Sequence, residues 1–130
     1  GMAVLTHLKL GGNDIGVEGA KALAYALKSG TAVLTVLTLN ENPIKDEGAI
    51  AIAESLKSNK SLLELDLFEC EIGAEGGKAL ASALNEPSAV LTKLDARYNM
   101  LGDEALYVLQ DAANRRKGFE LLTEAYRFFV

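Results

Sequence analysis

The amino-acid sequence predicts an α/β solenoid, a right-handed β-α superhelix with a parallel sheet on the concave side and helices on the convex side. A pattern of 28 or 29 residues occurs four times in the 130-residue chain. Each copy begins with leucines at alternating positions and ends with apolar residues at helical spacing. Because a single copy cannot bury both of its apolar sides, neighbouring copies must stack.

The four copies align in register and define the organisation of the chain. They begin as VLTHLKL, VLTVLTL, SLLELDL and VLTKLDA, and they occupy residues 4–32, 33–60, 61–89 and 90–118. Leucine recurs at the second position of each copy (Leu5, Leu34, Leu62, Leu91) and again three residues later (Leu8, Leu37, Leu65, Leu94). We interpret residues 1–130 as a single domain, with residues 119–130 as a C-terminal cap.

The first part of each copy predicts a short strand followed by a turn. In the second copy, Leu37 and Leu39 are separated by Thr38, which is the alternation of a strand with one buried side. The pair Asn42-Pro43 then marks the turn.

The second part of each copy predicts a helix. In the first copy the apolar stripe has the spacing i, i+3, i+4, i+7, at Ala20, Leu23, Ala24 and Leu27. Glu18 lies near the start of this segment and Lys28 near its end, where the helix dipole favours each charge.

The segment LTHLKLGGNDIGVEGAKALAYAL resembles the leucine-rich repeat consensus L-x-x-L-x-L-x-x-N/C-x-I/L in its long form. The period and the G-A-x-A-L-A segment resemble the ribonuclease-inhibitor-like subfamily, which includes the repeats of NOD-like receptors and of the Ran GTPase-activating protein. The resemblance covers residues 4–118. The fourth copy departs from it at Ala96, where a strand leucine is expected, and at Gln110 and Asp111, where small helix residues are expected.

The resemblance implies roles for two sets of residues. The Asn/Cys position of each repeat is a structural ladder whose side chain turns inward to bond the backbone; it is occupied by Asn13, Asn42, Cys70 and Asn99. The exposed strand positions and the loops after them form the usual ligand-binding surface. In this chain that surface comprises His7, Lys9, Val36, Thr38, Asn40, Glu64, Asp66, Phe68, Lys93, Asp95, Arg97 and Tyr98.

Composition argues against several classes of function. The net charge of −5 disfavours nonspecific nucleic-acid binding. The apolar runs are too short to cross a membrane, and the first residues lack the pattern of a signal peptide. Cys70 is the only cysteine, so we expect no intramolecular disulfide and a reducing, cytoplasmic location. His7 is the only histidine, and we expect neither a metal site nor a cofactor.

The third copy has six carboxylates against Lys78, and its net charge of −5 equals that of the whole chain. Glu64 and Asp66 lie on one face about 7 Å apart, a spacing that two catalytic carboxylates could use. No pocket is implied around them, so we do not expect an enzyme. Two interpretations of this surface remain: an ordinary solvated face, and a partner-binding patch that includes Phe68.

These observations favour a protein-interaction module that binds a protein ligand of unknown identity on its concave face. It could be a fragment of a larger receptor or scaffold. Two alternatives follow from the resemblance: a GTPase activator similar to the Ran-activating family, and an actin-filament capping domain like tropomodulin.

The two ends of the stack predict further features. The cap contains Phe119, Leu121, Leu122, Tyr126, Phe128 and Phe129, and its first residues align with the third strand. The first copy is preceded by no capping segment, so Leu8, Leu10, Ile15 and Leu23 should be partly bare. We therefore expect either a longer array or self-association through the uncapped N-terminal repeat.

Overall fold

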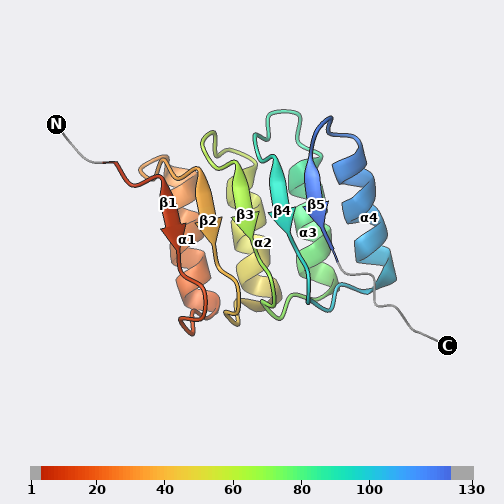
Figure 1. Ribbon diagram of the computed structural model, residues 1–130, viewed down its shortest axis with the longest axis horizontal. Coiled ribbons are helices and arrows are strands. Elements are labelled where there is room, and N and C mark those ends of the chain that lie inside the picture. The colour runs from red at the N-terminus through yellow and green to blue at the C-terminus, as the bar shows by residue number, and fades with distance from the viewer. Residues whose placement is uncertain (1–3, 124–130) are drawn as a thin grey trace.

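The computed structural model describes residues 4–123, in which strands and helices alternate (Figure 1). The strands are β1 (His7–Lys9), β2 (Val36–Thr38), β3 (Glu64–Asp66), β4 (Lys93–Asp95) and β5 (Glu120–Leu122). The helices are α1 (Val17–Ser29), α2 (Lys45–Leu56), α3 (Ala74–Leu84) and α4 (Gly102–Asn114). The predicted cap contributes β5, whereas its residues Tyr126, Phe128 and Phe129 lie outside the described residues.

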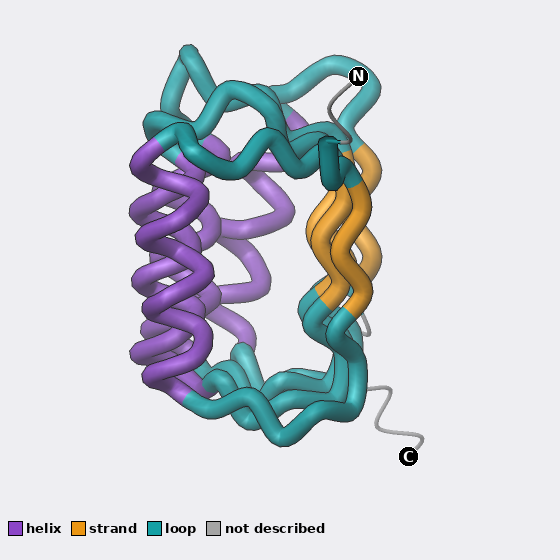
Figure 2. The backbone as a smooth tube through the Cα atoms, turned by 90° about the vertical axis from the view of Figure 1, so that its left-hand side faces the viewer, coloured by secondary structure: helices purple, strands orange, loops and turns teal. Residues whose placement is uncertain are grey.

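The strands form one parallel sheet in chain order, β1-β2-β3-β4-β5. Its register places Leu8, Leu37, Leu65, Leu94 and Leu121 side by side. Each helix packs against the next one along the chain, and Figure 2 shows the helices and the strands as two separate layers. The predicted α/β solenoid with a parallel sheet is therefore confirmed.

The core lies between these two layers. Leu37, Leu65 and Leu94 are at most 1% exposed, because each points from its strand toward the helices. Ala96 occupies the position of a strand leucine and is also buried, although it fills less space there. The small helix residues, such as Ala49 and Ala105, allow the helices to lie close to the sheet.

The helices begin where the sequence offers turn residues and acidic side chains. The start of α3 is capped by the neighbouring repeat: Asp46 Oδ1 of α2 accepts hydrogen bonds from the amides of Gly73 (2.7 Å) and Gly76 (2.9 Å). A Cβ on Gly76 would lie 2.8 Å from that same oxygen and 2.5 Å from Ile72 Cγ2. The third copy therefore needs glycine at this position.

The turns between strand and helix alternate along the stack. In the first and third copies a left-handed residue occurs at Asp14 and Glu71, whereas in the second and fourth it occurs at Lys45 and Gly102. A second left-handed position is common to all four copies, at Gly12, Glu41, Glu69 and Tyr98. These last residues follow closely after the strands and form one rim of the sheet.

The first repeat is less well covered than the others. Leu8, Leu10, Ile15 and Leu23 are partly buried and pack against the core from its edge. No described strand lies beyond β1, and Val4 and Leu5 are both 61% exposed. The expectation of partly bare leucines in this repeat agrees with the structure.

Candidate functional site

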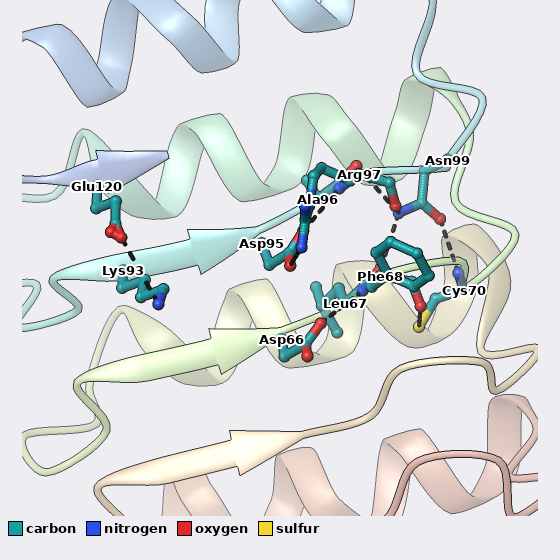
Figure 3. A network of polar contacts seen from close by, with 10 residues as sticks. All are labelled: Asp66, Leu67, Phe68, Cys70, Lys93, Asp95, Ala96, Arg97, Asn99 and Glu120. Atoms are coloured by element: carbon teal, nitrogen blue, oxygen red, sulfur yellow. Dashed lines mark hydrogen bonds and ion pairs between the residues drawn. The ribbon is translucent and has the colours of Figure 1, made fainter. Parts of the chain in front are cut away.

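The side chains that point away from the helices form a single surface across all strands, which we call the sheet face. Two rows run across the strands: His7, Val36, Glu64, Lys93 and Glu120, and then Lys9, Thr38, Asp66, Asp95 and Leu122. A third row, Asn40, Phe68 and Arg97, lies just beyond the strand ends, where backbone hydrogen bonds still join neighbouring copies. Figure 3 shows the part of this surface that β3, β4 and β5 contribute.

The middle of the sheet face contains a hollow of about 200 Å³. Side chains from β2 to β5 line it, among them Val36, Thr38, Glu64, Asp66, Asp95 and Leu122. Lys93 and Arg97 line it as well, so carboxylates, cations and apolar groups share this depression.

One carboxylate of the sheet face is already neutralised. Arg97 donates from Nε to Asp95 Oδ1 (3.1 Å) and from Nη2 to Asp95 Oδ2 (2.8 Å), and its own amide also bonds Oδ1 (Figure 3). Asp95 is 7% exposed. The sequence placed Asp95 among the exposed strand positions, but its side chain is buried because a bidentate arginine folds over the carboxylate. Its role in ligand binding stays a prediction.

Asp66, the neighbour of Asp95 in the sheet, accepts fewer hydrogen bonds than Asp95 does. Its Oδ1 accepts one hydrogen bond from the Phe68 amide at 2.9 Å. Burial raises the pKa of the Asp66 carboxyl above its usual value, and the negative charge of Asp95 acts in the same direction. The Phe68 amide, Arg97 and Lys93 oppose that shift. Asp66 is thus a partly desolvated carboxylate on an open surface.

An aromatic cluster adjoins the hollow. The rings of Phe68 and Tyr98 have centroids 5.0 Å apart and are tilted by 59°. The guanidinium carbon of Arg97 lies 5.3 Å from the centre of the Phe68 ring. Tyr98 remains 55% exposed. Arg97 therefore connects the acidic pair with the aromatic side chains.

The other predicted binding residues lie on the same surface with fewer contacts. His7 and Lys9 are exposed on β1, and His7 Nδ1 lies 2.9 Å from Thr6 Oγ1. Val36, Thr38 and Asn40 are partly buried. The Asn40 amide packs over Gly11, where a Cβ would come within 2.5 Å of Asn40 Oδ1.

Two residues of β5 belong to the sheet face although the sequence prediction omitted them. Glu120 lies 3.6 Å from Lys93 Nζ in an ion pair, and Leu122 pairs in register with Asp95. The alignment of Glu120 with Glu64 already placed Leu122 at the position of Asp66, so the signal was present in the sequence.

The Asn/Cys positions link consecutive turns. Asn42 Oδ1 accepts hydrogen bonds from the amides of Asn13 (3.0 Å) and Ile15 (2.8 Å), while its Nδ2 donates to the Leu10 carbonyl (2.8 Å). Asn99 repeats this arrangement on the turn of the third copy.

Cys70 and Asn13 fill the same position differently. The Cys70 thiol donates to the Leu39 carbonyl at 3.1 Å, and burial raises its pKa to about 12. A thiol that is buried and rarely ionised is a poor nucleophile. The Asn13 side chain is exposed and donates one hydrogen bond, to the Gly11 carbonyl. Its side chain does not turn inward, because no earlier turn lies beside it in the described chain.

Two other kinds of site are absent from residues 4–123. No group of three or more potential metal ligands comes together in this range. The described helices include none with the length and hydropathy needed to span a bilayer.

Comparisons with known proteins agree with this architecture. A sequence profile described as "Leucine Rich repeat" matches residues 2–24, 32–53 and 58–81. A search of curated proteins finds no match. Among solved structures, "Leiomodin-1 Actin-Binding Site 2 (ABS2)" is similar with a TM-score of 0.80 and 24% sequence identity, over 94% of this chain and 72% of that one. This structural similarity bears on the fold.

Proposed function

Because the chain belongs to the leucine-rich repeat family, we propose that it is a protein-interaction module and that its sheet face holds the protein ligand. One observation carries this proposal: a hollow, a partly desolvated carboxylate and a partly exposed aromatic cluster lie side by side on one surface. Aromatic anchors beside polar groups are typical of protein interfaces. The proposed activity is binding, without catalysis.

We assign the chain further to the ribonuclease-inhibitor-like subfamily. The repeat length of 28 or 29 residues supports this assignment. So does the alternation of two turn types, in which asparagine bridges come from the second and fourth copies. The buried Cys70 thiol favours a reducing compartment such as the cytoplasm.

The proposal is tested by affinity capture with two matched variants. The double variant Asp66→Asn with Phe68→Ala should lose its captured proteins while keeping the wild-type circular dichroism. Arg97 is left in place, because its removal would strand the buried carboxylate of Asp95. The control Glu75→Gln changes an exposed carboxylate of α3 and should retain every partner. Equal capture by all three proteins would exclude the sheet face as the binding surface.

Actin is a second candidate partner. The similar leiomodin-1 structure is that of an actin-binding site, and the tropomodulin-like alternative belongs to the same type of function. The test is sedimentation of actin filaments with and without the protein, together with a pyrene-actin assay of elongation. Co-sedimentation or a slowed elongation that the Asp66→Asn, Phe68→Ala variant lacks would support actin, and no effect on either readout would remove it.

We also propose self-association through the first repeat. An apolar hollow of about 380 Å³ lies there, lined by residues that include Leu5, Leu8, Leu23 and Val33. Sedimentation velocity should show a mass that rises with concentration and returns to the monomer value in Leu5→Glu. A monomer at high micromolar concentration would contradict this proposal.

A further inference from the structure

The charges of the sheet face are unevenly satisfied. Arg97 pairs with Asp95, and Lys93 pairs with Glu120. Within residues 4–123, by contrast, Glu64, Asp66 and Glu69 take part in no ion pair. The two cations that line the hollow, Lys93 and Arg97, are therefore each paired with a carboxylate, whereas Glu64 and Asp66, which also line it, remain available to a positive charge from outside.

The position of Lys9 does not cancel this excess. Lys9 lies in β1 and Asp66 in β3, with Thr38 of β2 between them in the same row. Adjacent strands are about 4.8 Å apart, so the backbones at Lys9 and Asp66 are separated by about 10 Å. The excess of negative charge consequently centres on β3.

The Phe68 ring offers an apolar surface close to the Asp66 carboxylate. Asp66 ends β3, and Phe68 lies in the turn that follows, two residues further along, so their backbones are at most about 7 Å apart. Phe68 is held by the Tyr98 ring and by the Arg97 guanidinium. An extended peptide has the same repeat between alternate side chains, so two of its residues can reach both places together.

We propose that the hollow receives a lysine or arginine side chain from an extended, basic segment of the protein partner, and that the side chain two residues away in that segment is apolar and packs on Phe68 and Tyr98. This inference rests on the proposed function and specifies the chemistry of the partner. The charge of Asp66 attracts the cation, and the aromatic rings supply the apolar contact. The spacing of the two contacts follows from β3 and its neighbouring loop.

The test is a titration of the isotope-labelled chain, followed by the shifts of its backbone amide resonances. The probe is an acetylated, amidated peptide with lysine and leucine two residues apart, separated by glycine or serine. The control peptide has glutamate in place of lysine. The titration is repeated with Asp66→Asn, with Glu64→Gln as a second variant of the same surface, and with Glu75→Gln on α3 as the matched control.

The lysine peptide should shift the amides of β3, β4 and the loop that contains Phe68. Its dissociation constant should rise about fivefold in Asp66→Asn and less in Glu64→Gln, because each removes one attracting charge. Glu75→Gln should leave the constant unchanged, and added salt should weaken binding to the wild type.

Four results would overturn the inference. Equal binding of the two peptides at the sheet face, or unchanged binding to both Asp66→Asn and Glu64→Gln, would reject the basic partner and leave the sheet face as an interaction surface. The absence of shifts with millimolar lysine peptide would also reject the basic partner, while affinity capture would still test the proposed function. Shifts confined to α1–α4 would reject both proposals.

Discussion

Asn99 accepts a hydrogen bond from the amide of Cys70, 29 residues earlier, at a distance of 2.9 Å. The same oxygen also accepts from Ile72, and the Asn99 amide group donates to three carbonyls, including that of Leu67. One side chain therefore satisfies the buried backbone of two consecutive turns. This link keeps the loops beside Phe68 and Tyr98 in a constant relation and so shapes the rim of the sheet face.

Replacement of Asn99 by alanine should destabilise the protein strongly. The change leaves several buried amides and carbonyls without partners, so we expect the free energy of unfolding to fall by about 3 kcal/mol or more. Asn13→Ala is the matched control, because Asn13 is exposed and makes one local bond; it should cost less than about 0.5 kcal/mol. Urea denaturation of both variants checks this, and equal losses would refute the bridging role of Asn99.

Asp46 caps the start of α3, whereas Asp103, at the same position two repeats later, caps no described helix. Asp46→Ala removes the acceptor for the Gly73 and Gly76 amides and should lower stability by about 1 kcal/mol. Asp103 occupies the same repeat position, and no hydrogen bond of its side chain occurs within the described residues, so Asp103→Ala should change stability by about 0.3 kcal/mol or less. Thermal unfolding distinguishes the two, and a larger loss for Asp103→Ala would contradict this assignment.

The Cys70 thiol should be inert in the folded protein. It is buried and its pKa is raised to about 12, so very little thiolate exists at mildly alkaline pH. A thiol reagent should therefore label Cys70 only as fast as the protein unfolds, and labelling should accelerate in denaturant. Rapid labelling without denaturant would show that the ladder position is open to solvent.

Asp66→Asn should weaken ligand binding without weakening the fold. The pKa of Asp66 is raised in the folded state, so the carboxyl stabilises the protein when it is protonated and loses that contribution as the pH rises through its folded pKa. Asparagine retains an oxygen for the Phe68 amide and carries no charge. The variant should match or exceed wild-type stability at neutral pH, with any gain vanishing below about pH 3.

Urea denaturation of Asp66→Asn and of the wild type, at neutral pH and below about pH 3, measures this difference in stability. If Asp66→Asn were clearly less stable than the wild type at neutral pH, Asp66 would be a structural residue.

The fold followed from the sequence because each repeat carries both periodicities. Leu37 and Leu65 recur at the same point of their copies, and the parallel register that joins them was predictable from stacking alone. The alternation of strand positions likewise placed Asp66 and Phe68 outward. These features depend on local pattern, which a single sequence contains.

The state of individual side chains on the sheet face was not predictable in the same way. Strand alternation places Asp95 outward, yet the side chain of Arg97 folds back to cover it. Asn13 matches the ladder pattern, yet it lacks the adjacent turn that would give it partners. In both cases the outcome depends on neighbours in space, which the repeat pattern does not encode.

Hydrogen exchange on the complex with a captured partner provides the most direct test of where this chain binds. Binding should slow exchange of the amides in Glu64–Asp66 and Lys93–Asp95 and in the loops that contain Phe68 and Tyr98, while the amides of the four helices should exchange as they do in the free protein. Protection that falls on the helices and spares these strands and loops would contradict the account.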